Sequence, residues 1–412
     1  MEKPAIEGGE PTVTFEPPHF SWPPITEQTR SVVLEQLEES ISIYNRSGII
    51  EELEDRLANY HGVSFALLTN SGTAALHSLY VGADLGPRDE VLCPAYTFFA
   101  TATPILFTGA QPIFVDCDEH GNIDPEDARS KVTDRTRAIV LTHMWGMPCN
   151  MTSLRKLAQD NELLLLEDGS HAHGASYKGE VVGSFGDGAA FSLQGQKTLT
   201  GGEGGFLLTD NEEIYYKALM LGQYNKRCLQ EIPSTHSLAK FAVTGMGLKM
   251  RIHPVAAAIA NQQLDDLDEV LSGRRKTAQM MISALSEVPG IEVPDVPTHI
   301  KHSWYAFMMQ YRSEELGDIP IEKFVKSLEY EGCKEVDRPG STCPLQYHEL
   351  FQNPDALFPS QESPLPAQCP QSEVFHEQAI KIPVWHDEKG KKIAKQYVDA
   401  IQKIGNWYST VS

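Results

Sequence analysis

The sequence has few basic residues: 34 lysines and arginines are outnumbered by 56 aspartates and glutamates, which gives a formal net charge of −22. Nucleic-acid binding needs clustered basic side chains that displace counterions from phosphates, so this balance argues against a nucleic-acid partner. The same charge disfavours an anionic membrane surface. No apolar run reaches the roughly 18 residues of a membrane span, and the N-terminus lacks a basic segment followed by an apolar one. We therefore expect a cytoplasmic protein with no nucleic-acid or membrane partner.

The sequence also lacks cysteine pairs, since its seven cysteines are scattered and form no C-x-x-C motif. This odd, dispersed set is typical of reduced cytosolic thiols. The composition, 41% hydrophobic and 22% charged, is that of a globular enzyme. A length of 412 residues predicts two or three packed domains.

Expected strands and helices alternate along most of the chain, which predicts an α/β fold with a mostly parallel sheet. Residues 1–25, rich in proline and glycine, are expected to form an arm on the body or on a partner subunit. Residues 26–288 would form the large domain, beginning with a helix over 26–43. Residues 289–412 would form a smaller C-terminal α+β domain, in which the irregular stretch 339–370 is too polar to contribute to a core.

The residues with the clearest chemistry lie at the ends of two expected strands. Four leucines precede Glu167 and Asp168, which predicts a buried strand ending at the sheet edge where α/β proteins bind ligands. Lys197 lies between a short strand and the glycine cluster 201–205, which lets the backbone come close to a ligand. A carboxylate and a lysine at one crevice suit a cofactor with a basic ring nitrogen and an aldehyde. At ~4 Å and an effective dielectric near 20, an aspartate–pyridinium pair is worth roughly 4 kcal/mol.

The same residues also have simpler interpretations. A lone lysine is usually solvated, and a lone aspartate can cap a helix or bind a metal. His171 and His173 share a face of an extended segment, but no third or fourth ligand stands at a recognisable spacing for zinc. A hydrogen bond from His171 to a phenolic oxygen of the cofactor is the preferred interpretation. A Walker loop is excluded because Gln196 precedes Lys197, and the glycine cluster lacks the strand–G-x-G-x-x-G–helix order of a dinucleotide site.

A possible phosphate site lies between an expected strand and an expected helix. Ser71 is a natural N-cap, and Gly72 and Thr73 offer free backbone N–H groups and a hydroxyl. Many such turns are only helix caps. Phe98, where the next strand meets a helix, fits either a core position or a stacking position on a flat ligand.

Six motifs follow one another along the chain: SGTAAL at 71–76, PAYTFFAT at 94–101, EDGSHAHGA at 167–175, FSLQGQK at 191–197, GGEGG at 201–205 and GLKMRIHPVAAAIANQQL at 247–264. Together they resemble the DegT/DnrJ/StrS family of aminotransferases, which use pyridoxal 5′-phosphate to aminate keto-sugars and keto-cyclitols. The resemblance covers nearly the whole chain, and the ordered set is more specific than any single motif. It implies the α/β architecture of fold-type I pyridoxal-phosphate-dependent transferases.

The resemblance also implies roles for single residues. Lys197 would form the Schiff base with the cofactor and then move the proton between Cα of the donor and C4′ of the cofactor. Asp168 would pair with the pyridine nitrogen, and His171 would lie near the phenolic oxygen. Phe98 and Ser170 would flank the two faces of the ring.

For the phosphate, the resemblance implies Gly72, Thr73 and Ser192. The family motif G-x-N-x-R reads G-L-K-M-R at 247–251, so that Lys249 replaces an asparagine that usually reaches the phosphate of the partner subunit. Lys249 either makes this contact as a point charge or the contact is lost. Two other departures, Gln194 and Gly195 in place of frequent histidine and proline, suggest a subgroup with an unusual substrate.

The implied function is ping-pong transamination in a homodimer whose active site lies at the subunit interface. Glutamate or glutamine would leave its amine on the cofactor, and a ketone on a sugar or cyclitol would accept it, in the biosynthesis of amino sugars or other secondary metabolites such as antibiotics. The alternatives are a sugar dehydratase, whose relatives carry histidine in place of Lys197, other chemistry of the same cofactor, and a non-catalytic cofactor- or sugar-binding regulator. Six polar or aromatic residues are candidates for the walls of the acceptor site: Tyr44, Asn45, His143, Trp145, Asn225 and His386. Side chains of this kind are at least as often ordinary surface or packing groups.

Overall fold

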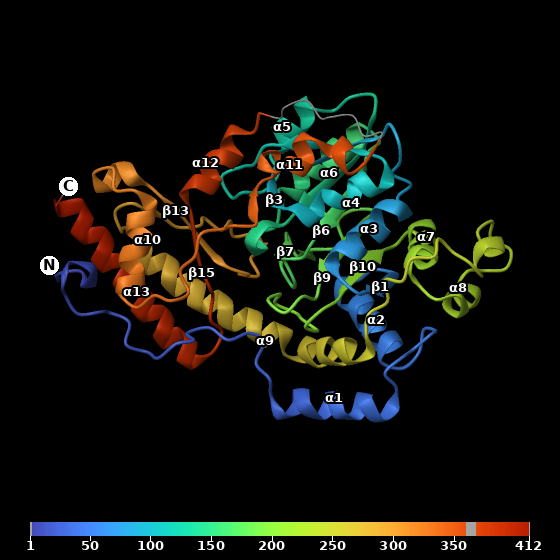
Figure 1. Cartoon of the computed structure of the whole chain (residues 1–412), viewed down its shortest axis with the longest axis horizontal. Coiled ribbons are helices and arrows are strands. Elements are labelled where there is room, and N and C mark those ends of the chain that lie inside the picture. Colours follow the sequence, from blue (N-terminus) through green and yellow to red (C-terminus); the bar gives the residue numbers. More distant parts are fainter. Residues whose placement is uncertain (1, 360–367, 412) are drawn as a thin grey trace.

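A seven-stranded sheet forms the centre of the larger lobe in the computed structural model, which describes residues 2–359 and 368–411 (Figure 1). The strand order is β1-β10-β9-β6-β5-β2-β4. β10 runs antiparallel to β1 and β9, and the other neighbouring pairs are parallel, which confirms the expected mostly parallel sheet. The strands are β1 (Phe65–Thr69), β2 (Glu90–Pro94), β4 (Gln111–Val115), β5 (Thr136–Thr142), β6 (Leu164–Asp168), β9 (Gly188–Ser192) and β10 (Gly205–Thr209).

Helices cover both faces of this sheet, so its strands are buried on two sides. In β6, Leu165 belongs to the apolar cluster under one layer of helices and Leu166 to the cluster under the other. This double burial explains why β6 is a continuous leucine run and does not alternate with polar residues. The helices of this lobe are α2 (Gly48–His61), α3 (Gly72–Gly82), α4 (Thr103–Thr108), α5 (Pro125–Ser130), α6 (Met151–Asp160), α7 (Glu212–Gly222) and α8 (Asn225–Glu231).

The first helix is shorter than expected. α1 (Glu27–Glu39) begins at a capping box formed by Thr26 and Thr29, but it ends four residues before Ile43. Its C-cap residue, Ser40, has extended backbone angles, and its hydroxyl oxygen accepts a hydrogen bond from the Ser42 N–H. Such local side-chain bonding competes with helix continuation.

The long helix α9 (Pro254–Leu285) connects the two lobes (Figure 1). Its first half packs on the sheet, whereas Ala278, Met281 and Leu285 belong to the apolar cluster of the C-terminal lobe. This lobe contains a three-stranded antiparallel sheet of order β11-β13-β15. Its elements are β11 (Ile291–Glu292), β13 (Phe307–Tyr311), β15 (Ala379–Ile382), α10 (Ile321–Tyr330), α12 (Pro370–Gln378) and α13 (Glu388–Val411).

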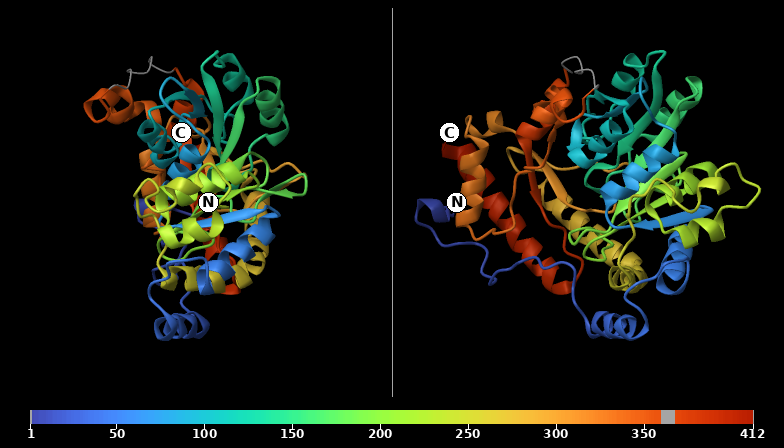
Figure 2. Two further views of the ribbon diagram at one scale, coloured as in Figure 1. Left: turned by 90° about the vertical axis from the view of Figure 1, so that its right-hand side faces the viewer. Right: turned by 45° about the vertical axis from the view of Figure 1, so that its right-hand side comes forward.

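The N-terminal arm lies along the C-terminal lobe of its own chain, next to α13 (Figure 2). Val13 is part of the apolar cluster of that lobe. The buried carboxylate of Glu331 accepts hydrogen bonds from the backbone N–H groups of Ala5 and Thr12, at 2.7 and 3.0 Å, and pairs with Lys403 at 2.9 Å. The arm therefore contacts the body of its own chain.

The irregular stretch 339–370 contributes to a core, contrary to expectation. Leu345, Phe351 and Cys369 are buried in an apolar cluster of the large sheet. The segment is anchored there because β14 (Thr342–Pro344) pairs with β3 (Tyr96–Phe98). Leu357 in the same segment is exposed, so a few well-placed contacts, and not average polarity, decide which side chains are buried. The remaining short elements are α11 (Glu349–Gln352), β7 (Ser176–Tyr177), β8 (Glu180–Val181) and β12 (Ile300–Lys301).

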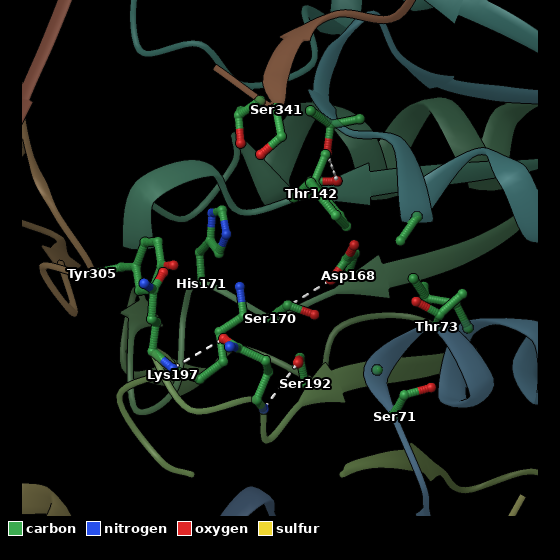
Figure 3. Close-up of a pocket in the computed structure, with 18 of the residues that line it drawn as sticks. Ser71, Thr73, Thr142, Asp168, Ser170, His171, Ser192, Lys197, Tyr305 and Ser341 are labelled. Atoms are coloured by element: carbon green, nitrogen blue, oxygen red, sulfur yellow. Dashed lines mark hydrogen bonds between the residues drawn. The ribbon is translucent and has the colours of Figure 1, made fainter. Parts of the chain in front are cut away.

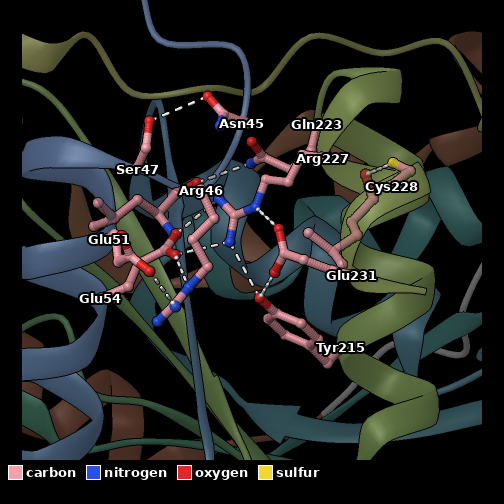
Figure 4. A network of polar contacts seen from close by, with 12 residues as sticks. Asn45, Arg46, Ser47, Glu51, Glu54, Tyr215, Gln223, Arg227, Cys228 and Glu231 are labelled. Atoms are coloured by element: carbon pink, nitrogen blue, oxygen red, sulfur yellow. Dashed lines mark hydrogen bonds and ion pairs between the residues drawn. The ribbon is translucent and has the colours of Figure 1, made fainter. Parts of the chain in front are cut away.

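A buried ion network joins α2 to α8 (Figure 4). The Glu54 carboxylate accepts two hydrogen bonds from the Arg227 guanidinium, at 2.9 and 2.7 Å, and one from Arg46 at 3.2 Å. It also accepts the backbone N–H of Leu68 in β1 at 2.9 Å. Since β1 leads directly to Ser71, this network fixes the strand from which α3 begins.

Among residues 2–359 and 368–411, no helix combines the length and apolar character needed to cross a membrane.

Candidate functional site

A cavity of about 320 Å³ opens where the carboxyl ends of β5, β6 and β9 meet the start of α3 (Figure 3). This is the edge at which parallel sheets present ligand-binding residues. Residues of the C-terminal lobe and of segment 339–342 close its other side. The sequence-predicted residues that line it are Gly72, Thr73, Phe98, Asp168, Ser170, His171, Ser192 and Lys197.

Asp168 is the last residue of β6, and its carboxylate is held at both oxygens. The buried hydroxyl of Thr101 donates to Oδ2 at 2.8 Å, and the Ser170 backbone N–H donates to Oδ1 at 3.1 Å. Behind Thr101, the hydroxyls of Thr97 and Thr142 lie 3.0 and 3.2 Å from its own. Asp168 is only 5% exposed. A fixed carboxylate of this kind can hold a cationic nitrogen in one orientation.

Lys197 projects into the same cavity from the loop between β9 and β10. Its backbone N–H donates to the Gln194 carbonyl at 2.8 Å, and its carbonyl accepts the indole N–H of Trp22 at 2.7 Å. Burial lowers the pKa of Lys197 to about 8, a shift that Asp168 opposes and Lys381 reinforces. At pH 7 roughly one amine in ten is then neutral, against fewer than one in a thousand for an ordinary lysine. A neutral amine is the form that attacks a carbonyl.

His171 lies in a stack of aromatic rings beside Lys197. Its ring centroid is 4.2 Å from that of Tyr305 and 5.4 Å from that of Trp145. Burial lowers the pKa of His171 well below 6.5, with further lowering by Lys197, so the ring is neutral. Its Nδ1 is buried and has no hydrogen-bond partner in the described part of the chain. That nitrogen is available to a polar atom of a ligand in the cavity.

The two histidines of the H-x-H segment do not act together. His173 donates from Nε2 to the carbonyl of Ser192 at 2.9 Å, whereas His171 faces the cavity. Within residues 2–359 and 368–411, no three histidine, cysteine or acidic side chains are grouped as a metal site would require.

The start of α3 approaches the end of β9 unusually closely. A Cβ on Gly72 would lie 2.6 Å from the Cβ of Ser192, and one on Gly205 would lie 2.5 Å from the backbone carbon of Ser71. The Ser71 hydroxyl caps the helix by accepting the Ala74 N–H at 3.0 Å, as predicted. Free N–H groups at the helix start, with nearby hydroxyls, form a suitable cradle for a phosphate.

A strained turn at Trp145 shapes the wall between the lobes. Trp145 has a φ of 56°, and Gly146, with a φ of 99°, has no space for a Cβ because Ser303 Oγ would lie 2.3 Å from it. Backbone N–H groups of Ser303 and Tyr305 donate to the carbonyls of Gly146 and Trp145, each at 3.0 Å. These bonds bring Tyr305 into the cavity.

Other sequence-predicted residues lie elsewhere. Among the candidate wall residues only Trp145 lines the cavity; Tyr44 and Asn45 line a separate small pocket, and buried His143 bonds to Glu167 at 3.0 Å. Asn225 is the first residue of α8, and the His386 ring packs edge-on against Trp22. Lys249 is exposed in the loop before α9 and does not line the cavity of its own chain.

Several lining residues were not anticipated from the sequence. Thr142 ends β5 and lines the cavity. Thr101 does not line it but holds Asp168 from behind, and the threonines of the T-F-F-A-T-A-T segment were an available signal for this residue. The lining residues from distant segments gave no local signal: Tyr305, Ser341, Thr342 and Lys381.

Lys197, Asp168 and the start of α3 would all be used by a ligand that carries an aldehyde, a basic ring nitrogen and a phosphate. Pyridoxal phosphate has these three groups, and the unpaired Nδ1 of His171 offers a partner for its ring hydroxyl. The fold and the cavity therefore define a pyridoxal-phosphate-dependent enzyme with the fold-type I architecture.

Comparison with known proteins gives the family. Residues 25–402 match the DegT/DnrJ/EryC1/StrS aminotransferase family, and the chain belongs to this family of pyridoxal-phosphate-dependent enzymes that includes sugar and cyclitol aminotransferases. It is 30% identical over 335 residues to GDP-perosamine synthase of Escherichia coli O157:H7, with 80% of this chain and 87% of the relative covered. It is also 30% identical over 292 residues to L-glutamine:scyllo-inosose aminotransferase of Streptomyces griseus, with 70% of this chain and 69% of the relative covered. The crystal structure of an aminotransferase from Psychrobacter cryohalolentis superposes with a TM-score of 0.83 at 26% identity, covering 95% of this chain and 98% of that one.

Proposed function

We propose that this aminotransferase takes the amino group of glutamate or glutamine and transfers it to a ketone on a sugar or cyclitol. The observation that carries the proposal is that Lys197, with a pKa lowered to about 8, shares one cavity with the doubly hydrogen-bonded Asp168. One relative is named for glutamine and scyllo-inosose, which supports a cyclitol acceptor. Another is named for GDP-perosamine, which supports a sugar acceptor.

In this proposal each cavity residue has a defined task. Pyridoxal phosphate, when bound, supplies an electron sink for the carbanion formed at Cα of the donor. Lys197 would hold the cofactor through Nζ, and its neutral amine would accept and return the proton of the donor's Cα. Asp168 would hold the ring nitrogen in its protonated form, and Nδ1 of His171 would bond the ring hydroxyl.

The remaining predicted residues would position the cofactor. Gly72, Thr73 and Ser192 would hold the phosphate at the start of α3. Phe98, which is 37% exposed and lines the cavity, would stack on one face of the cofactor ring, and Ser170 would lie near the other face.

The experiment that tests the function is an absorbance titration of the apoprotein with pyridoxal phosphate, followed by glutamate or glutamine. We expect the band of the lysine-bound cofactor to form, and one of the amino acids to convert it to the pyridoxamine form with release of the corresponding keto acid. Lys197→Ala should show neither step. A band that ignores both amino acids would contradict transamination, and water loss from a sugar or oxygen uptake would point to a dehydratase or an oxidase.

We further propose a homodimer with a shared active site. Exposed apolar side chains on α1 (Leu34 and Leu37) and in the loop before α9 (Val243 and Leu248) support a subunit interface, and Lys249 directly follows Leu248 in that loop. In such a dimer Lys249 would reach the phosphate bound by the partner subunit.

Mixing two inactive variants tests this arrangement. One chain carries Lys197→Ala and the other Lys249→Glu, so that a mixed dimer has one site with both lysines intact. We expect activity to appear on mixing, and light scattering to give twice the chain mass. A monomer, or a Lys249→Glu protein as active as the wild type, would refute the shared site.

A cytoplasmic location is also proposed. The seven cysteines are all free and buried, which suits a reducing compartment. Cell fractionation would test it, and recovery in an oxidising compartment would count against it.

A further inference from the structure

A second lysine, Lys381, lines the cavity together with Lys197. It belongs to β15, in which Ile380 and Ile382 are buried in the apolar cluster of the C-terminal lobe. Because side chains alternate along a strand, Lys381 faces the opposite side, toward the cavity. Among the described lining residues, only these two carry side chains that are positive near neutral pH, since His171 is held neutral.

The surroundings of Lys381 leave its charge only partly compensated. Its Nζ lies 2.9 Å from Oδ2 of Asp337, but the side chain of Asp337 is 63% exposed and that of Lys381 31% exposed. An ion pair this exposed to water contributes little to stability and is easily exchanged. The backbones of the two residues are fixed to each other by reciprocal hydrogen bonds of 2.8 and 3.0 Å. Lys381 is thus held in place while its ammonium group can change partners.

Lys381 is also close to the reacting centre. Its Nζ is 5.9 Å from the ring centroid of Trp145, that ring is 6.2 Å from Tyr305, and the Tyr305 ring is 4.8 Å from Nζ of Lys197. The two lysines therefore lie along one aromatic wall. Their proximity is also expressed in the lowered pKa of Lys197, to which Lys381 contributes. A second cavity, of about 510 Å³, shares Trp145, Tyr305 and Lys381 with the first, so Lys381 stands at the boundary between the two.

We propose that Lys381 binds the α-carboxylate of the amino-acid donor, and that its ammonium group leaves the Asp337 carboxylate to do so. This inference rests on the proposed transaminase function. In that reaction the Cα of the donor would have to come within reach of Nζ of Lys197, and the donor's carboxylate is one bond away from Cα. A carboxylate placed in a partly buried site needs a cation or several hydrogen bonds. Lys197 is occupied by proton transfer, which leaves Lys381 as the cation for this group.

The test compares two amines that differ only in the α-carboxylate. L-Glutamine and 4-aminobutanamide are each titrated against the wild-type holoenzyme and Lys381→Met, with L-glutamate as a second donor. We expect Lys381→Met to raise the half-saturating amino-acid concentration roughly 10- to 100-fold, the range for a lost hydrogen bond to a charged group. The half-saturating 4-aminobutanamide concentration should change by less than about twofold, and Lys381→Arg should largely retain amino-acid binding.

Two further variants sharpen the test. Lys334→Met removes the same charge from an exposed lysine that lines only the second cavity, and it should leave both titrations unchanged. Asp337→Asn removes the competing carboxylate and should act in the opposite direction, lowering the half-saturating amino-acid concentration about two- to fivefold, as expected for a weak exposed ion pair.

The possible results separate the two proposals. If Lys381→Met affects both amines equally, Lys381 acts only on Lys197 and the inference is wrong while transamination stands. If Lys381→Met affects neither amine, the inference is likewise wrong and transamination still stands. If the wild-type band responds to neither glutamate nor glutamine, the proposed function fails and the inference fails with it. Retention of the lysine-bound cofactor band in Lys381→Met shows that the variant is folded, and Lys381→Gln replaces it if that band is lost.

Discussion

Replacing Thr101 with valine removes the hydroxyl that donates to the Asp168 carboxylate, together with its contacts to the hydroxyls of Thr97 and Thr142. The hydroxyl of Thr101 is fully buried, and its 2.8 Å bond to Oδ2 is one of the two bonds that hold the carboxylate. Valine has nearly the same shape as threonine, so no cavity is created. Oδ2 would then lie beside a methyl group, without the donor that stabilises its negative charge.

The expected cost follows from the charge of the acceptor. A hydrogen bond to a charged group contributes about 1.5–3 kcal/mol, and leaving a buried charged atom unpaired costs at least as much. Because Asp168 is the predicted partner of the ring nitrogen, part of this loss should appear in cofactor binding. We expect Thr101→Val to weaken binding of pyridoxal phosphate by roughly 10-fold or more, and to slow the half-reaction with the amino-acid donor.

The matched control is Thr97→Val. The hydroxyl of Thr97 is equally buried but bonds only to the hydroxyls of Thr101 and Thr142, at 3.0 and 3.1 Å. Loss of such a neutral bond costs about 1 kcal/mol, or roughly fivefold. Both variants are titrated with pyridoxal phosphate by absorbance. Equal effects of Thr97→Val and Thr101→Val would refute the reasoning, because the carboxylate would then gain nothing special from Thr101.

Three other predictions follow from the described contacts. Since burial lowers the pKa of Lys197 from 10.5 to about 8, the rate of cofactor attachment to the apoprotein should rise with pH and level off above about 8. The unfolded chain keeps this proton up to higher pH, so the same group should make the apoprotein more stable as the pH rises from 8 to 10.5. Gly72→Ala places a methyl group 2.6 Å from Cβ of Ser192, and should weaken binding of pyridoxal phosphate roughly tenfold through a displaced helix start, while binding of phosphate-free pyridoxal is unchanged. Glu54→Gln removes the carboxylate that accepts two hydrogen bonds from buried Arg227, which keeps its ion pair with Glu231, and should lower the free energy of unfolding in urea by roughly 3 kcal/mol.

Each of these predictions has a control. An attachment rate that keeps rising to pH 10.5 would show that Lys197 titrates as an ordinary lysine. Gly86→Ala is a matched substitution in open space, with no atom within 4 Å of the added Cβ, and should leave both ligands unaffected. Glu51→Gln breaks an exposed pair with Arg46 and should cost less than about 1 kcal/mol. A Glu54→Gln protein as stable as Glu51→Gln would contradict the structural role of the buried network.

The elements that could be predicted from the sequence are those with a local signal. The leucine run before Asp168 predicts a buried strand because both faces of β6 are covered. The S-G-T turn predicts a helix start because its serine caps α3 in the structure. In each case a few neighbouring residues both form the element and place the functional side chain.

The elements that could not be predicted depend on contacts between distant segments. The strand pair β14–β3 joins residues more than two hundred positions apart, and the buried residues Leu345, Phe351 and Cys369 of segment 339–370 follow no regular period. The end of α1 was overestimated because a hydroxyl bond at Ser40, and not a glycine or proline, accompanies it. Average composition and periodicity do not detect such features.

This difference explains why the cofactor could be inferred from the sequence and the substrate could not. Asp168, Lys197 and the start of α3 lie at strand ends of one sheet, so their motifs are short and appear in a fixed order. The opposite wall is built by Tyr305, Ser341 and Lys381, from three segments that meet only through the packing of the two lobes along α9. None of these three has a motif of its own. A choice of donor or acceptor made at this wall would depend on residues that only the three-dimensional structure brings together, Lys381 among them.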